Sequence, residues 1–125
     1  MIRNLNEEKP IFLQIAEMLK DAILNGSYSE ESQIPSITEF SVAYKINPAT
    51  ALKGVNILVD EGLLYKKRGL GMFVSEGARE RLALQRKEDF YMKYIKPMVK
   101  EAGNLRIEKN ELMTMTERGI EENAN

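Results

Sequence analysis

The residues that could carry chemistry in this sequence are basic side chains and glycines, not nucleophiles or metal ligands. The chain has no cysteine and no histidine, which excludes disulfides, thiolate and imidazole metal ligands, and the usual proton shuttle at neutral pH. The other polar residues show no nucleophile–base pair, phosphate-binding loop or carboxylate constellation. We therefore expect no cofactor, no metal and no enzymatic activity, and we expect the chemistry of this chain to be recognition.

The basic residues gather in one segment, although the chain as a whole is not basic. The formal net charge is −1, and neither residues 1–75 nor residues 76–125 carry a net positive charge. Between residues 45 and 68, however, five basic residues stand against only Asp60 and Glu61, a local charge of +3. The five are Lys45, Lys53, Lys66, Lys67 and Arg68. A patch of this kind suits the phosphate backbone of DNA.

Three helices are predicted to position the first part of this segment. Apolar residues recur at three-to-four spacing from Pro10 to Asn25 and predict an amphipathic helix. Ser36 and Glu39 have the spacing of a capping box that opens a second helix, which ends near Tyr44. A third helix begins at the cap pair Asn47-Pro48, is stopped by Gly62, and buries a periodic face. That predicted face consists of Ala51, Leu52, Val55 and Leu58.

The turn between the second and third helices and the segment after the third complete the pattern. Only Lys45, Ile46 and about one neighbour separate the two helices, which predicts a helix-turn-helix. The β-prone runs Leu63 to Tyr65 and Met72 to Val74 then flank a basic, glycine-containing turn, which predicts a hairpin. A basic hairpin directly after the second helix of such a motif is a wing.

At these residues the chain resembles the GntR family of bacterial regulators. The resemblance runs from Pro10 to Val74 through five blocks at the spacing of the family. The blocks are Pro10 to Ile15, Ile34 to Phe40, Asn47 to Thr50, Glu61 to Leu64 and Arg68 to Val74. The tail of about fifty residues that follows is similar in length and helical character to the YtrA subfamily. The resemblance implies a repressor that occupies promoters, often of operons for ABC-type transporters.

The resemblance and the residue pattern together indicate where DNA is contacted. Ser36 is expected to cap its helix and also to reach a phosphate. For Thr50, a phosphate or base contact competes with a solvated surface position, while Ala49 suits a thymine methyl. At Lys53 the family usually has an arginine that reaches DNA, and lysine cannot form the bidentate fork to guanine. The expected contacts are Ser36, Thr38, Lys45, Asn47, Ala49, Thr50, Lys53, Lys66, Lys67, Arg68, Gly69, Leu70 and Gly71.

Two positions depart from the family pattern. Thr38 stands where the family typically has an arginine on the second helix, so one charge-assisted contact is missing, and Lys45 is a candidate to compensate. Leu70 replaces a commonly polar residue at the tip of the wing, where Gly69 and Gly71 serve turn geometry and permit close approach to the minor groove.

The segment after the wing predicts two further helices. One runs from Glu76 to Ala102 and is kinked or broken at Pro97, and the other runs from about Glu108 to Glu121, with residues 122–125 frayed. Two helices cannot enclose a core, so their apolar stripes must meet either the winged domain or the same helices of a second subunit, and we favour the second. The residues expected at this seam are Leu84, Tyr91, Ile95, Met98, Leu112 and Met115.

The sequence as a whole predicts a mainly α-helical protein with a small β-hairpin: a winged helix-turn-helix domain over residues 1–75 and a helical dimerisation region over residues 76–125. It is expected to bind a double-stranded DNA operator with an inverted repeat as a homodimer. The alternative is a winged-helix protein-interaction module. Because residues 1–10 show no signal peptide and no uncharged run reaches the length of a bilayer, we expect a soluble, cytoplasmic protein without membrane contact. An effector pocket is expected only between the domains or at the dimer seam.

Overall fold

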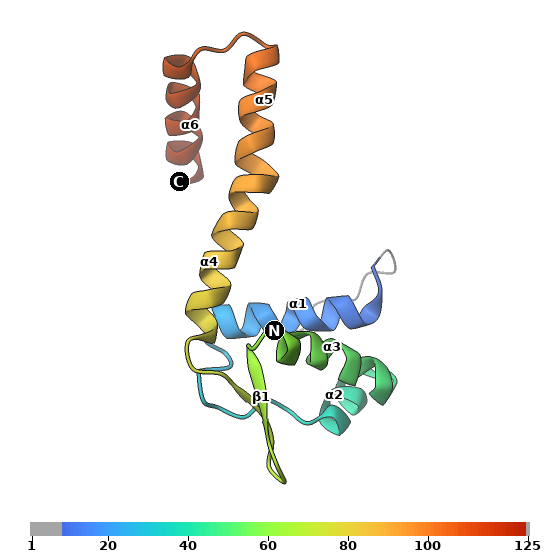
Figure 1. Ribbon diagram of the computed structural model, residues 1–125. Coiled ribbons are helices and arrows are strands. Elements are labelled where there is room, and N and C mark those ends of the chain that lie inside the picture. The colour runs from blue at the N-terminus through green and yellow to red at the C-terminus, as the bar shows by residue number, and fades with distance from the viewer. Residues whose placement is uncertain (1–8, 125) are drawn as a thin grey trace. The chain divides into compact units, whose positions relative to one another are not determined.

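The computed structural model describes residues 9–124 and divides into two compact units, one up to Leu84 and the other from Gln85 onward (Figure 1). Residues 1–8, which include most of the segment searched for a signal peptide, lie outside the described residues. Within the described part, no helix is long and apolar enough to cross a membrane.

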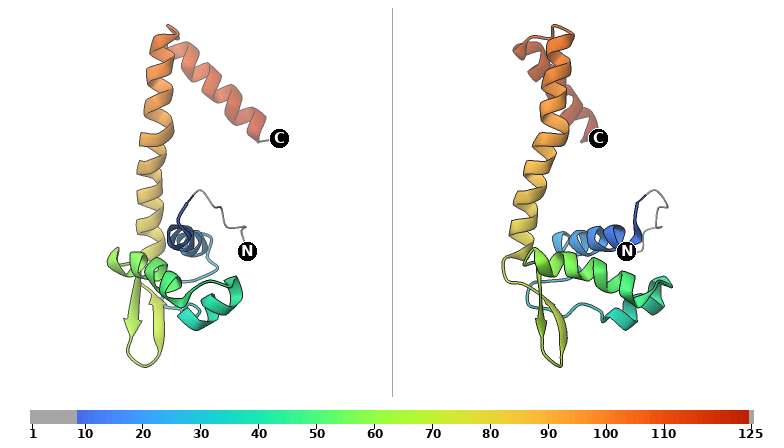
Figure 2. Two further views of the ribbon diagram at one scale, coloured as in Figure 1. Left: turned by 90° about the vertical axis from the view of Figure 1, so that its right-hand side faces the viewer. Right: turned by 45° about the vertical axis from the view of Figure 1, so that its right-hand side comes forward.

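The first unit is built from the helices and the hairpin that the sequence predicted. Helix α1 spans Ile11–Leu24, α2 spans Ile37–Tyr44 and α3 spans Pro48–Asp60. Strands β1 (Leu64–Lys67) and β2 (Gly71–Val74) pair antiparallel. A further helix, α4 (Ala78–Phe90), begins in this unit. In every view α2 and the hairpin lie on the same side of α1 (Figure 2).

One hydrophobic core holds this unit together. Helix α1 contributes Ile15, Leu19 and Ile23, which are almost fully buried because residues three or four positions apart share one face of a helix. The core also contains Ala78 and Leu82 of α4, so it extends beyond residue 75. Other members are Ile34, Phe40, Ala51, Val55, Leu58, Leu63, Leu64 and Val74.

The prediction that Leu52 lies in this core is wrong. Its side chain is 43% exposed, whereas Ala51, Val55 and Leu58 are fully buried. Each residue turns an α-helix by about 100°, so position 52 is rotated off the line on which these three lie. The buried face of α3 is completed instead by Gly54.

The second unit consists of helices. After α4 comes a π-helical turn, η1 (Tyr91–Ile95), followed by α5 (Lys96–Asn104) and α6 (Lys109–Asn123). Helix α6 folds back from the end of α5, and the two splay apart from their connection (Figure 2). The helix is not broken at Pro97, but the turn just before this proline is wider than an α-helical turn. In that turn the N–H of Lys96 donates to the carbonyl of Tyr91, five residues earlier. Helix α6 continues to Asn123, so residues 122 and 123, which the sequence predicted to fray, are helical.

Candidate nucleic-acid interface

The N-terminus of α2 is closed by the capping box that the sequence predicted. The Ser36 hydroxyl accepts from the N–H of Glu39 at 3.1 Å, and the Glu39 carboxylate accepts from the N–H of Ser36 at 2.8 Å. The Ser36 backbone hydrogen bond and then its side-chain bond lower the pKa of Glu39, against a weaker opposing effect of burial. Two of the amides at this helix end are therefore already used by the chain itself. The capping box leaves the Ser36 hydroxyl hydrogen unused, and the side chain of Thr38 is exposed.

The turn between α2 and α3 presents Lys45 in an unusual backbone conformation. Lys45 is the C-cap of α2 with φ 54° and ψ 50°, in the left-handed region, and its side chain is exposed. The Ser41 hydroxyl donates to the carbonyl of Ile46 at 2.6 Å and fixes the turn from the other side. The side-chain oxygen of Asn47 accepts from the N–H of Ala49 at 2.8 Å. Asn47 therefore acts as a helix cap, as its sequence context predicted.

The first turns of α3 carry three of the expected contact residues. Ala49 and Lys53 are exposed and Thr50 is half-buried. The Lys53 ammonium lies 4.1 Å from the centroid of the Phe12 ring on α1, a cation–π contact worth about 0.5–1 kcal/mol at an exposed site. Phe12 thus holds this cation in place at the surface. Sequence reasoning did not single out Phe12.

A second residue that the sequence analysis did not single out is Gly54, which sets the distance between α1 and α3. A Cβ at this position would lie 2.8 Å from the carbonyl oxygen of Phe12 and 2.8 Å from Cγ2 of Ile15. Only glycine lets the two helices approach this closely. A glycine inside a predicted helix, where it costs about 1 kcal/mol relative to alanine, was the available signal.

The wing ends in a tight turn made possible by its glycines. The N–H of Leu70 donates to the carbonyl of Lys67 at 2.9 Å. Gly69 has φ 80° and Gly71 φ 124°, values that side chains disfavour. The turn leaves Leu70 63% exposed at the tip. A Cβ on Gly69 would meet nothing within 4 Å, so the tip is open at this residue, whereas Gly71 lies against the side chain of Gln33.

Two of the three basic residues of the wing, Lys66 and Lys67, lie on opposite faces of the hairpin. The Lys67 ammonium lies 4.4 Å from the centroid of Phe73 and 5.9 Å from that of Tyr65, so the aromatic pair of one hairpin face holds it. Lys66 is its neighbour on the same strand and therefore faces the other side. Lys66 and Arg68 are both exposed.

The segment that leads from α1 to α2 supports the wing. Gln33 bridges Phe73 of β2 through the backbone, and its side-chain amide donates to the carbonyl of Leu70. The Tyr65 hydroxyl donates to the Glu31 carboxylate at 2.8 Å, and this bond is the main cause of a raised Tyr65 pKa. These contacts join residues more than thirty positions apart in the sequence, so no local sequence pattern predicts them.

An ion pair changes the charge that this surface presents. Lys20 of α1 lies 2.9 Å from the Glu61 carboxylate. Glu61 is one of the two acids in the basic segment, and the pairing brings an additional cation from outside the segment to balance it. Lys20 therefore offsets the charge of Glu61, while Glu31, which accepts from Tyr65 of the wing, brings a negative charge from outside the segment.

In the second unit, three of the six residues expected at a dimer seam come together. Met98, Leu112 and Met115 line an open hollow of about 620 Å³ between α5 and α6, together with Ala102, Leu105 and Ile120. Tyr91 and Ile95 lie on η1, and Leu84 belongs to α4 in the first unit. Tyr91 and Leu84 are exposed and Ile95 is half-buried.

Comparisons with known proteins agree on one family. The family profile described as "Bacterial regulatory proteins, gntR family" matches residues 12–74. The repressor NagR of Bacillus subtilis is 39% identical over 84 residues, which are 66% of this chain and 34% of NagR. The repressor YtrA of the same organism is 33% identical over 73 residues, 58% of this chain and 56% of YtrA. The chain thus spans about a third of NagR and just over half of YtrA.

Solved structures extend the likeness beyond the winged unit. A GntR-family protein from Bacteroides thetaiotaomicron is 34% identical, with a TM-score of 0.76, over 90% of this chain and 98% of that one. The DNA-binding domain of AraR in complex with the operator ORX1 is 27% identical, with a TM-score of 0.53, over 60% of this chain and 93% of that one.

Proposed function

Because this chain belongs to the GntR family of bacterial regulatory proteins, in its YtrA-like subfamily, we propose that it represses transcription by binding an inverted-repeat operator as a homodimer. The relatives are transcription regulators and not enzymes. AraR, a structural neighbour, is bound to an operator through its equivalent domain. The site of action of this chain would be the cytoplasm, where a bacterial chromosome lies.

The observation that carries DNA binding is the pairing of an exposed helix start with an exposed basic wing on one unit. Ala49 and Lys53 are exposed on α3, and Lys66 and Arg68 are exposed on the wing. A recognition helix in the major groove, flanked by basic side chains on the phosphates, would use this combination. The wing tip, with its glycines, suits the adjacent minor groove.

Repression and dimerisation rest on different support. NagR and YtrA are named as repressors, and occupying a promoter needs no further activity. Dimerisation is supported by the second unit, in which Ala102 is the one buried apolar residue among those described. Two such units, packed through the hollow between α5 and α6, would bury the apolar side chains that each leaves exposed.

A footprint of the purified protein on its own promoter region tests the proposed function. We expect protection of an inverted repeat whose half-site centres lie about one helical turn, roughly 34 Å, apart or somewhat less. Affinity should fall steeply as salt rises, because phosphate contacts release counterions. Binding that is absent or independent of salt would favour the protein-interaction module.

Analytical ultracentrifugation of a fragment tests the role of the second unit. The fragment should end at Leu84, because Ala78 and Leu82 belong to the core of the first unit. We expect residues 1–84 to fold as a monomer and the full chain to sediment as a dimer at micromolar concentration. A dimeric fragment or a monomeric full chain would assign the second unit another role.

A further inference from the structure

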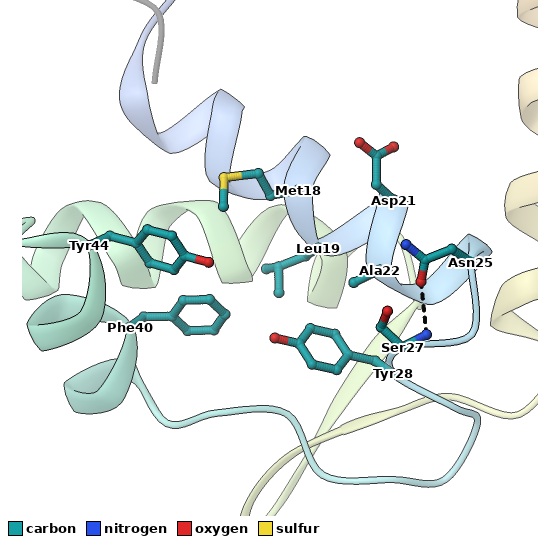
Figure 3. A pocket seen from close by; sticks show the side chains of 9 residues that line it. All are labelled: Met18, Leu19, Asp21, Ala22, Asn25, Ser27, Tyr28, Phe40 and Tyr44. Carbon is teal, nitrogen blue, oxygen red and sulfur yellow. Dashed lines mark hydrogen bonds between the residues drawn. The ribbon is translucent and has the colours of Figure 1, made fainter. Parts of the chain in front are cut away.

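The outer face of α3 carries a large apolar side chain that the core does not use. Leu52 is 43% exposed. By contrast, Leu19 of α1 and Phe40 of α2 are 2% and 5% exposed, and both line the small pocket enclosed between those two helices (Figure 3). A single exposed leucine is common on protein surfaces, so any role for Leu52 depends on what lies around it.

Leu52 shares its face of α3 with residues that are expected to contact DNA. Ala49 lies three positions earlier, Lys53 is the next residue and Asn56 lies four positions later, and all three are exposed. Residues three or four positions apart are neighbours on a helix surface. Together with Leu52 these residues line one open hollow of about 380 Å³ beside Phe12 of α1. Leu52 therefore belongs to the surface that a recognition helix turns toward the bases.

The charges around Leu52 favour DNA as the molecule that covers it. Lys53 adjoins Leu52, and Lys45 is exposed in the turn before α3. The one acid of α3 is Asp60, its last residue, about two turns beyond Leu52. A leucine side chain has neither donor nor acceptor, so the base edge that suits it in the major groove is the 5-methyl group of thymine.

We propose that Leu52 is a specificity-determining residue that recognises a thymine of the operator by packing against its methyl group. This inference rests on the proposed binding of an operator. Neighbouring Cβ atoms on the helix lie about 5–6 Å apart, and successive bases of one strand lie about 3.4 Å apart. The thymine that Leu52 contacts therefore lies within about two base pairs of the one that suits Ala49. Lys53 contributes affinity through the phosphates, whereas Leu52 distinguishes the base.

Replacing thymine by deoxyuridine removes only the methyl group and tests this contact. The full chain is titrated, by fluorescence anisotropy, with the footprinted operator in which the thymines of one half-site are replaced one at a time. At the thymine that Leu52 contacts, the replacement should weaken wild-type binding about fourfold, the effect of one buried methyl group. At the same position the Leu52→Ala variant should lose less than about twofold, because the partner of the methyl group is already gone.

Two further variants control for the loss of a side chain. Leu13→Ala truncates a leucine of α1 whose exposure, 38%, is close to the 43% of Leu52, and it should respond to deoxyuridine as the wild type does. Leu52→Met keeps an unbranched apolar side chain in place and should also keep the response. All three variants should remain folded by circular dichroism, since both positions are exposed.

The possible outcomes separate this inference from the proposed function. If every methyl-sensitive thymine affects the wild type and Leu52→Ala equally, the methyl contacts belong to Ala49 or another residue, and the role of Leu52 is refuted. An operator that binds equally well with deoxyuridine at every position would refute it too. In both cases operator binding itself would stand. Absence of any DNA binding would overturn the proposed function together with this inference.

Discussion

Replacing Gly54 by alanine tests the packing that positions α3 for DNA. The added Cβ would lie 2.8 Å from the Phe12 carbonyl oxygen and from Cγ2 of Ile15, whereas carbon atoms in contact lie about 3.5–4.0 Å apart. The oxygen belongs to the backbone of α1 and cannot rotate away, so the two helices must separate. Overpacking of this kind costs about 1–3 kcal/mol, and the better helix propensity of alanine returns about 1 kcal/mol. We expect a net loss of up to about 2 kcal/mol and a fall in Tm of up to about 15 °C.

The assay is thermal and urea unfolding of the full chain followed by circular dichroism. Gly103→Ala is the matched control, because Gly103 lies in α5 and a Cβ there meets nothing within 4 Å. That variant should melt at or slightly above the wild-type temperature. Operator affinity should fall for Gly54→Ala, since α3 is displaced, and stay constant for Gly103→Ala. If Gly54→Ala is as stable as the control, the close approach of α1 and α3 does not limit the fold.

Four further results are expected. Lys53→Ala and Arg68→Ala should each weaken operator binding in gel-shift titrations and flatten the slope of log affinity against log salt by about 0.9 per lost phosphate contact. Thr38→Arg should raise DNA affinity, most strongly at low salt, by adding a cation to the exposed face of α2. Met98→Asp should give a monomer in the ultracentrifuge, because it would bury a charge in the proposed seam. Acidification should weaken the α2 cap: the pKa of Glu39 is lowered from 4.5, so its contribution is present above that value and lost as pH falls through the folded pKa, as an NMR titration would report.

Each of these results has its control or its contrary outcome. Lys109→Ala removes an exposed lysine from α6 and should leave both operator affinity and salt slope unchanged. Weaker binding by Thr38→Arg would mean that Thr38 itself makes a contact that arginine displaces. A Met98→Asp variant that stays dimeric would move the seam away from the hollow between α5 and α6. An ordinary titration of Glu39 would remove the capping box as the origin of its pKa.

Local chemistry in the sequence predicted the elements of the first unit well. The Ser36–Glu39 capping box and the Asn47-Pro48 helix start are both present, because caps depend on residues within one turn of each other. The hairpin pairs Leu64 with Val74 and Lys67 with Gly71, which follows from the turn glycines. Features decided by a few adjacent residues are readable from one chain.

Features decided by contacts between distant residues were not predictable in this way. Leu52 has the right residue type for the core, but the contact of α3 with α1 passes through Gly54 and leaves position 52 outside it. The support of Leu70 by Gln33 joins the wing to a loop 37 residues earlier. At Lys53 the sequence indicated an exposed cation, and only the tertiary structure brings Phe12 beneath it.

The π-helical turn at Tyr91–Ile95 gives the long helical segment one place where its length can change. A π turn holds one residue more than the α turn it replaces. Deleting a residue there converts it into an ordinary turn and keeps the residues on either side in register. The same deletion within α4 would rotate every later side chain by about 100°. Insertions and deletions among relatives of this chain should therefore concentrate at this turn.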